Sequence, residues 1–314
     1  MKISVVCGSR ANNKELLLRF LQMLNHQTFK EFDVNIICDR KFTDVEEINF
    51  ISFFEGQNLE VVNRTHFFTN NNSDFNPNHW WWASYVRNFG ISKAKWEFIQ
   101  LFDDDNEVGP DFLETCLHKR EILTSELKKE CVILPSLYYR NTNQIQNQWF
   151  CRFNYRQSRP ILNLLNWKEK SQIQMFSWNW IFSEASTLKK AKYDEEIARI
   201  SEDLDYTLSL YEQGIQLRVF SDLKVIHYER DKTKLEQARI WSYSQARQKA
   251  RNRFLFIKKH WRKKQLYQFY MWWLPWCIIR LSMKAIIRWW KNRLKIIKWL
   301  FDWVKEWYNL THKK

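Results

Sequence analysis

Three consecutive aspartates, Asp103 to Asp105, follow an apolar segment, residues 97–102, whose pattern predicts a buried β-strand. Two carboxylates about 4 Å apart repel each other by roughly 4 kcal/mol at an intermediate dielectric, so such a run is costly without a cation. Hard carboxylate oxygens are ligands that suit Mg²⁺ and Mn²⁺. A solvated acidic turn would explain three aspartates alone. The apolar strand before them favours a Mn²⁺ or Mg²⁺ site at a strand end.

Apolar segments elsewhere in the first half alternate with helical patterns. Strand patterns occur at residues 2–7, 32–38 and 59–62, and helical spacings occur at residues 16–24 and 83–94. This alternation predicts an α/β fold, a Rossmann-like, mostly parallel central sheet with helices on both faces. Ligands bind beyond the carboxyl ends of the strands in such sheets. We expect that edge to present Gly8-Ser9-Arg10, Asp39 and Asp103 to Asp105.

The second half continues with a helix, a strand and an irregular aromatic stretch that is consistent with a substrate-facing insertion, at residues 111–130, 131–135 and 137–182. Ser201 is a good N-cap for a helix that runs through Tyr211. Glu202 and Asp203 in its first turn favour the positive end of the helix dipole, which would by itself explain both acids. Gly214 ends this helix. Short strands follow at residues 217–220 and 224–226, and His227 closes the second one.

The net charge of +15 is concentrated in the last part of the chain. Residues 232–314 hold 22 Lys or Arg against 3 Asp or Glu, whereas residues 1–231 hold 28 against 32. We therefore predict a catalytic domain at 1–231, with halves at about 1–110 and 111–231. A basic, aromatic helical extension at 232–314 would follow it. Such a tail is attracted to anionic lipid head groups or to nucleic acid.

The longest apolar run of the tail, residues 269–279, is shorter than the roughly 20 residues that span a bilayer. An interfacial anchor on an anionic membrane surface therefore fits better than a spanning helix. A solvated helical extension that packs on the catalytic domain is the alternative. Scattered cysteines and a first strand without a signal-peptide pattern predict a reduced, cytoplasmic protein, peripheral on the inner face of the cell membrane.

Eighteen Trp stand against only five Gly in this chain. A chain of this length would carry about 22 Gly at the usual share of roughly 7%. Several Trp also occupy positions where a loop would favour Gly, namely Trp80 to Trp82, Trp96, Trp178 and Trp180. We hypothesise that some of these positions are UGA codons that the source cell reads as Gly. The alternative is a Trp-rich protein with an aromatic belt at a membrane interface.

Taken in order, these segments resemble the family 2 glycosyltransferases of GT-A fold, of the bacterial rhamnosyltransferase-like kind, over roughly residues 1–260. The first half of the resemblance consists of Cys7-Gly8-Ser9-Arg10, Asp39, Arg87-Asn88-Phe89-Gly90, and Phe102 to Asn106, which matches the D-x-D element. Arg40 departs from the second acid that the family usually has after Asp39. The second half consists of Ser177 to Phe182, and of Tyr193-Asp194-Glu195 with Ser201-Glu202-Asp203, which resembles the acceptor-side motif. At Trp96, Trp178 and Trp180 the family favours Gly.

The resemblance implies a hexosyltransferase that moves a sugar from a UDP- or dTDP-sugar donor to a hydroxyl of a saccharide or lipid-linked acceptor, with inversion, in cell-surface polysaccharide or glycolipid synthesis. The implied donor-binding residues are Ser9, Arg10, Asp39, Arg87, Asn88, Asp103 and Asp104. The implied ligands of Mn²⁺ or Mg²⁺ are Asp105, Asp103 and His227. The acceptor hydroxyl must lose its proton as it attacks, so a general base is needed. Asp203 would be that base, and Glu202 would position the acceptor or the base.

Two other classes of function stay open. Basic residues interleaved with aromatic ones can track a nucleic-acid backbone, although the excess charge is confined to the tail and the sheet edge is acidic. Salt-dependent oligonucleotide binding that Asp105→Ala leaves unchanged would favour this interpretation over nucleotide-sugar transfer. The other class is a non-catalytic sugar-binding scaffold on the same fold. Metal-dependent transfer that disappears in Asp103→Asn, Asp105→Asn and Asp203→Asn variants would exclude it.

Overall fold

The computed structural model describes residues 1–9, 14–38, 42–69, 82–139, 150–154, 159–162, 171–176, 180–197, 202–227, 252, 255–256 and 258–260. Arg10, Asp39, Ser201 and most of the predicted tail therefore lie outside the described residues. Among the described residues, no helix is both long and apolar enough to cross a membrane.

The first part of the chain forms β1 (Ile3–Ser9), α1 (Lys14–Asn25), β2 (Phe32–Cys38), α2 (Asp44–Glu55), the 3-10 turn η1 (Glu60–Arg64), β3 (Thr65–Phe68), α3 (Trp82–Lys93) and β4 (Phe98–Asp103). The middle forms β5 (Asn106–Val108), α4 (Phe112–Leu127), β6 (Cys131–Tyr139), β7 (Phe150–Asn154), β8 (Arg159–Leu162), β9 (Ser171–Ile173) and β10 (Met175–Phe176). The last part forms β11 (Phe182–Glu184), α5 (Ala185–Leu188), α6 (Glu202–Glu212) and β12 (Gln216–His227).

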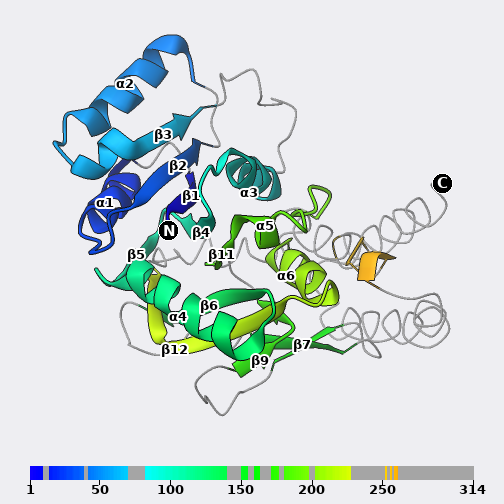
Figure 1. Ribbon diagram of the computed structural model, residues 1–314. Helices are drawn as coiled ribbons and strands as arrows, with labels where there is room; N and C mark the ends of the chain where they lie inside the picture. The colour runs from blue at the N-terminus through cyan, green and yellow to red at the C-terminus, as the bar shows by residue number, and fades with distance from the viewer. Residues whose placement is uncertain are drawn as a thin grey trace, which may run out of the picture.

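The described strands form a large sheet in the order β3-β2-β1-β4-β11-β6-β12-β5, with β9 against β12, and a small sheet β10-β7-β8. Each parallel ladder of the large sheet joins at least four residue pairs, whereas each antiparallel ladder joins at most three. β11 is antiparallel to both β4 and β6, so β4 and β6 run in the same direction. The predicted mostly parallel sheet is confirmed. Its parallel strands end at one edge (Figure 1).

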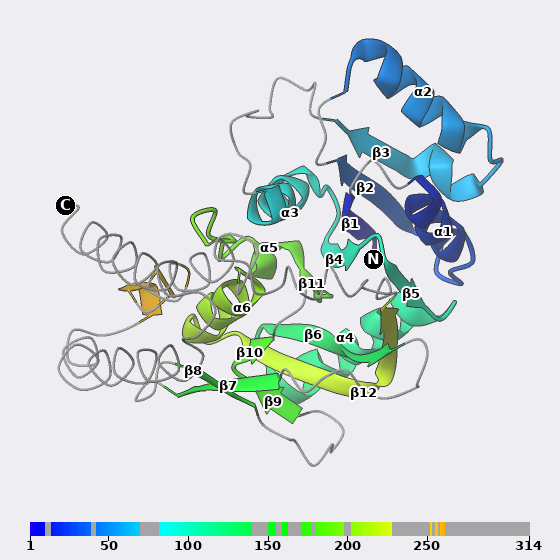
Figure 2. The same ribbon diagram turned by 180° about the vertical axis from the view of Figure 1, so that it is seen from behind.

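Helices cover both faces of this sheet. Residues paired in register on parallel strands point to the same face, and neighbours along a strand point to opposite faces. Phe102 pairs with Cys7. The centroid of its ring lies 5.6 Å from that of Phe20 on α1 and 5.6 Å from that of Phe112 on α4. Val6 points the other way, toward α3. The helices α1 and α4 therefore cover one face and α3 covers the other (Figure 2).

Two glycines let α3 approach the sheet closely. An added Cβ at Gly90 would stand 2.3 Å from Cγ1 of Val6 and 2.9 Å from Cδ1 of Ile37. At Gly8, the last residue but one of β1, an added Cβ would stand 2.9 Å from Cγ1 of Val86 on α3. Separations below 3.0 Å require something to shift, so larger side chains do not fit here. The close contact brings the part of α3 that precedes Gly90 to the carboxyl ends of β1 and β4.

One predicted strand is wrong, because residues 59–62 belong largely to η1, and the strand β3 follows it. Val61 and Val62 are both buried, which neighbouring residues of an edge strand would not normally be. The N–H of Val61 donates to Oδ1 of Asn25 at the end of α1, at 3.0 Å, instead of to a strand. This tertiary contact outweighs the β-propensity of two adjacent valines.

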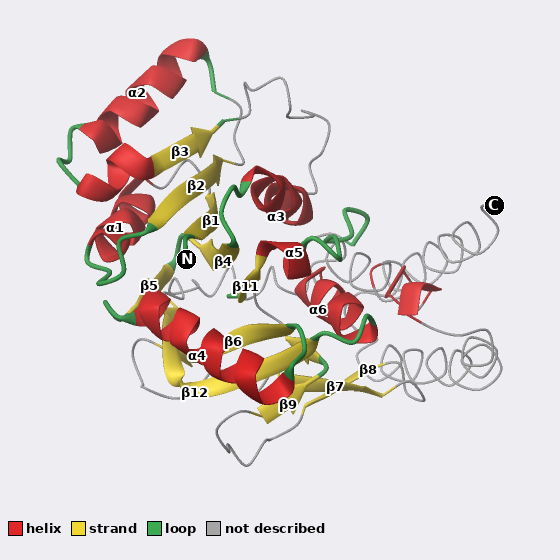
Figure 3. Ribbon diagram, in the orientation of Figure 1, coloured by secondary structure: helices red, strands yellow, loops and turns green. Residues whose placement is uncertain are grey.

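Three further elements differ from those predicted. Gly8 and Ser9 lie within β1 instead of a following loop. The two strands predicted at 217–220 and 224–226 are one strand, β12, with a register shift between Phe220 and Lys224 (Figure 3). The helix α2 was not predicted, although Thr43 and Glu46 form a capping box at its start. Gly214 does end α6, with a φ of 85° that favours glycine.

Candidate active site

The strand ends bring several predicted site residues together. Ser9 is the last residue of β1, Asp103 of β4 and His227 of β12. Gly8 pairs with Asp103 across the β1–β4 ladder, and His227 pairs with Asn106 across the β12–β5 ladder. The acidic turn at 103–105 is thus held between two ladders. The strand pattern predicted that β4 ends at this edge, but it did not predict β5 or its pairing with β12.

The first two carboxylates of the acidic turn have different partners. Asp104 accepts a 2.7 Å hydrogen bond from the hydroxyl of Ser9. Asp103 lies 3.3 Å from Nη2 of Arg87, a residue of α3 whose side chain is largely buried. Two neighbouring charges therefore point to different donors. Protein groups thus relieve part of the repulsion that the sequence analysis expected a cation to relieve.

The two carboxylate oxygens of Asp105 differ, because only one of them has a partner among the described residues. Its Oδ2 lies 3.2 Å from Nε2 of His227, whereas its Oδ1 is buried and accepts no hydrogen bond from the described residues. A buried, unsatisfied carboxylate oxygen is costly, and it is the kind of ligand that suits Mg²⁺ or Mn²⁺. In the described part of the chain, however, no three His, Cys, Asp or Glu side chains converge on one point. Asp103, Asp105 and His227 therefore do not form a closed metal shell.

Arg87 connects this edge to the acids at the start of α6. Its Nη1 lies 3.3 Å from Oε1 of Glu202, while its Nη2 lies 3.3 Å from Asp103. Burial alone would lower the pKa of Arg87, but the charges of Asp103 and Glu202 outweigh it and raise the pKa. One guanidinium thus links the predicted donor side with the predicted acceptor side. The sequence motif placed Arg87 at the site, but nothing in it indicated Glu202 as a partner.

Asp203 has a raised pKa. Burial, the main cause, and the neighbouring charge of Glu202 raise the pKa of Asp203 to about 8. The N–H of Leu204 donates to its Oδ1 at 2.8 Å, which opposes the shift. A carboxyl group with a pKa close to the working pH can both take up and release a proton. This property is consistent with the general base that the sequence analysis predicted.

Asn88 is engaged away from the acidic turn. Its Nδ2 donates to the carbonyl of Tyr193 at 2.9 Å and to Oε1 of Glu195 at 3.0 Å, and its Oδ1 accepts from the N–H of Tyr193 at 2.9 Å. The Tyr193 ring stacks on Tyr206 of α6 with centroids 4.0 Å apart. Asn88, predicted as a donor-binding residue, therefore attaches residues 193–195 to α3. Contacts between residues 105 positions apart have no local sequence signal.

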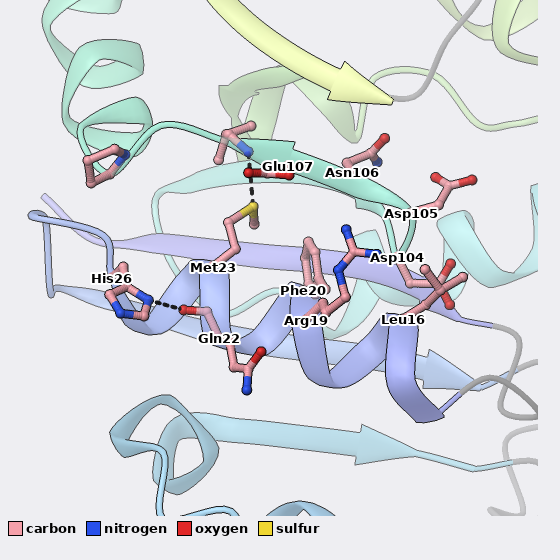
Figure 4. Close-up of a pocket in the computed structure, with 12 residues that line it drawn as sticks. Leu16, Arg19, Phe20, Gln22, Met23, His26, Asp104, Asp105, Asn106 and Glu107 are labelled. Carbon is pink, nitrogen blue, oxygen red and sulfur yellow. Dashed lines mark hydrogen bonds between the residues drawn. The ribbon is translucent and has the colours of Figure 1, made fainter. Parts of the chain in front are cut away.

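A cavity of about 480 Å³ lies on the α1 side of the acidic turn (Figure 4). Its wall includes Asp104 and Asp105, and it also includes Arg19 and Met23 of α1. The sulfur of Met23 accepts a 3.1 Å hydrogen bond from the N–H of Val108, which holds β5 against α1. The cavity gives a ligand space beside two of the carboxylates. The rings of His227 and of the buried Trp180 have their centroids 5.9 Å apart.

No protein-family model matches this sequence, and no curated protein sequence matches it. The structure is similar to S. aureus TarS 1–349, with a TM-score of 0.57 and 15% identity over 98% of this chain and 80% of that chain. TarS 1–349 in complex with UDP-GlcNAc gives a TM-score of 0.56 and 16% identity over 98% and 81%. The complex with UDP gives 0.50 and 16% over 80% and 64%. At this identity the likeness shows the fold, which is a GT-A-like glycosyltransferase fold.

Proposed function

We propose that this chain is a metal-dependent glycosyltransferase that moves a sugar from a nucleotide-diphospho-sugar to an acceptor hydroxyl, with inversion at the anomeric carbon. The observation that supports it best is the path from Asp103 through Arg87 to Glu202, with 3.3 Å at each ion pair. It joins acids at the strand ends, where ligands of such sheets bind, to a helix start with a carboxyl group of raised pKa.

The donor is proposed to be a UDP-sugar. S. aureus TarS, whose fold this chain shares, has been crystallised in complex with UDP and with UDP-GlcNAc. Ser9, Asp103 and Asp104 lie at the edge where a nucleotide would bind, and Arg87 lies beside them. Arg10 and Asp39, outside the described residues, follow β1 and β2 directly and would extend the donor site. A dTDP-sugar is the second donor to test.

Mn²⁺ or Mg²⁺ would be held by Asp105, whose buried Oδ1 is free to accept a ligand, with Asp103 and His227 as the other candidate contacts. A divalent cation there supplies neutralisation of the charge that develops on the departing diphosphate. For Asp103 to contribute, its carboxylate would have to share its charge with Arg87. Arg87 itself is also placed to attract the negatively charged diphosphate.

The transfer is a direct displacement in this proposal. The acceptor oxygen forms a bond to the anomeric carbon as the bond from that carbon to the diphosphate oxygen breaks, and the electron pair leaves with the nucleoside diphosphate. The hydroxyl proton goes to the carboxylate of Asp203. Burial and, after it, the charge of Glu202 keep the pKa of Asp203 high, and Glu202 is itself held by Arg87. No covalent intermediate with the protein is needed.

The acceptor is proposed to be a saccharide or a lipid-linked saccharide at the inner face of the cell membrane. The support is the basic composition of residues 232–314, most of which lie outside the described residues. Co-sedimentation with vesicles is the test. Binding to vesicles that contain anionic lipid, lost at high salt and absent for neutral vesicles, is expected. Equal binding to both kinds of vesicle, or to neither, would contradict it.

Nucleotide release with UDP-GlcNAc, other UDP-hexoses and dTDP-sugars tests the activity itself. Release is expected with Mn²⁺ or Mg²⁺ and not in EDTA. It should fall at least about 100-fold in Asp105→Asn, because stabilisation of the leaving group is lost. Asp111→Asn is the matched control, since Asp111 is exposed and makes no capping hydrogen bond to α4. Full activity in EDTA, or in Asp105→Asn, would overturn the assignment of the metal.

A further inference from the structure

A buried cluster of charges joins α6 to residues 258–260, which the sequence analysis placed in the tail. Asp205 on α6 is fully buried, and both of its carboxylate oxygens have partners. Its Oδ2 accepts a 2.6 Å hydrogen bond from Nζ of Lys259, and its Oδ1 lies 2.7 Å from Nε2 of His260. The described residues between 252 and 260 lie beside α6 in both views, in orange (Figures 1 and 2).

His260 has a carboxylate at each ring nitrogen. Besides Asp205 at Nε2, Oε2 of Glu212 lies 2.8 Å from Nδ1. A neutral imidazole has a single N–H, so it would turn a lone pair toward one of the two carboxylates, whereas the imidazolium donates to both. Burial, the largest effect, lowers the pKa of His260, but its hydrogen bonds to Asp205 and Glu212 and their charges outweigh it and raise the pKa. Lys259 and the ring of Phe256 complete the surroundings.

The cluster adjoins Glu202 and Asp203, the acids of the proposed reaction. Asp205 belongs to the same first turn of α6 as Glu202 and Asp203, and each helical residue adds only about 1.5 Å along the axis. A displacement of Asp205 therefore displaces Asp203. Lys259 also lies 3.6 Å from Asp194, in the segment that Asn88 attaches to α3. Lys259 thus contacts both segments that flank Arg87, and His260 contacts α6.

We propose that Lys259 and His260 are positioning residues of the active site, which hold the first turn of α6 so that Asp203 and Glu202 face the strand ends. This inference rests on the proposed function, because it gives Asp203 a part in the transfer step. It also makes residues 258–260 part of the catalytic unit instead of a separable tail. Burial supports it, because the His260 side chain is 1% exposed and Leu255 and Phe256 are buried with it.

Steady-state kinetics of Asp205→Asn and His260→Gln tests this role. Each variant keeps the size of the side chain and removes one charge. We expect kcat to fall by about 10- to 100-fold, since small misplacements of reacting groups have effects of that order. The KM for the nucleotide sugar should change by less than about twofold. The double variant should be no slower than the slower single variant, because both changes break one pair. Lys258→Gln, an exposed neighbour, is the control and should keep its kcat.

Unchanged kcat in folded Asp205→Asn and His260→Gln would overturn the proposal. A matched loss of donor affinity and kcat would also overturn it, because the cluster would then support the whole fold instead of α6. If these variants do not fold, Glu212→Gln replaces them. Glu212 is partly exposed, and the substitution removes only the carboxylate charge beside Nδ1 of His260. It should lower the pKa of His260 and reduce kcat, and no change in either would contradict the proposal.

The charge on His260 can be measured without an activity assay. In ¹⁵N NMR, with the His260 signals identified by their loss in His260→Gln, both ring nitrogens should be protonated at pH 7. A neutral ring at pH 7 would contradict the bridge between Asp205 and Glu212. A wild-type protein that neither binds nor turns over any nucleotide sugar would overturn the proposed function instead. The NMR result would then still show whether the charged cluster exists.

Discussion

The strand-end site (Ser9, Asp103 to Asp105 and His227) and the helix-end site (Glu202 and Asp203 on α6) are built in different ways. Backbone ladders place every residue of the strand-end site at or just after the end of a strand. The helix-end site depends on side chains that come from α3, from residues 193–195 and from residues 258–260. A substitution at the strand-end site should therefore affect only the substituted residue and its ligand. A substitution among the residues that support the helix-end site can displace the whole first turn of α6.

The largest expected effect distinguishes the helix-end site, which would act in catalysis, from the strand-end site, which would bind the donor. Asp203→Asn should lower kcat by about 1,000-fold, the scale of a lost general base, and leave the Kd for UDP nearly unchanged. Asp105→Asn should weaken UDP binding in the presence of Mn²⁺, because the metal would no longer link protein and diphosphate. Calorimetric titration with UDP and turnover with the UDP-sugar measure the two quantities. Weakened UDP binding in Asp203→Asn but not in Asp105→Asn would reverse the assignment.

Trp180, whose ring lies 5.9 Å from that of His227, gives the next largest effect. If Trp180 is the native residue, Trp180→Gly should lower the free energy of unfolding by about 3 kcal/mol or more, because it empties a fully buried site. Trp96→Gly is the comparison, since Trp96 is only partly buried and packs against Lys2. Urea denaturation measures both. Glycine variants that are as stable as the parent chain, with a native mass short by multiples of the Trp-to-Gly difference, would support UGA recoding instead.

Gly90 tests how firmly α3 holds the two sites together. Gly90→Ala should destabilise the protein by about 2 kcal/mol, because the new Cβ collides with Val6 and Ile37. Gly56→Ala is the matched control, since Gly56 has an ordinary φ of −67° and its nearest neighbour would be 3.4 Å from the Cβ. Its stability should change by less than about 1 kcal/mol. Equal effects of the two changes would mean that α3 is free to move away from the sheet.

The smallest expected effect is a shift of the pH profile. Asp203, as the proposed general base, must be deprotonated to act, so kcat should fall as the pH drops through its raised pKa, about 8. Glu202→Gln removes a neighbouring negative charge, which lowers that pKa and moves the acid limb to lower pH. Burial, the larger cause, is kept, so the shift should be only a fraction of the total displacement. A limb that stays in place, or moves to higher pH, would contradict the coupling.

The sequence predicted the strand-end site better than the helix-end site, for a physical reason. A parallel sheet brings the carboxyl ends of its strands to one edge, so Ser9 and Asp103 could be placed from apolar strand patterns, whereas His227 was placed there by the family resemblance. The partners of Arg87 and Asp205 are side chains 16 to 115 residues away, and no local pattern encodes them. Short apolar runs such as 59–62 are ambiguous for the same reason, since a contact from Asn25 decided their conformation.

The position of β5 in the sheet has a consequence for protein synthesis. β5 begins three residues after β4 ends, yet it is separated from β4 in the sheet and pairs with the last residues of β12. A nascent chain can pair β1, β2 and β4 as soon as these strands leave the ribosome, but β5 has no partner until residue 227 follows. Such distant pairings form slowly. The acidic turn would thus be completed late, and the first 110 residues released alone would keep it unfinished.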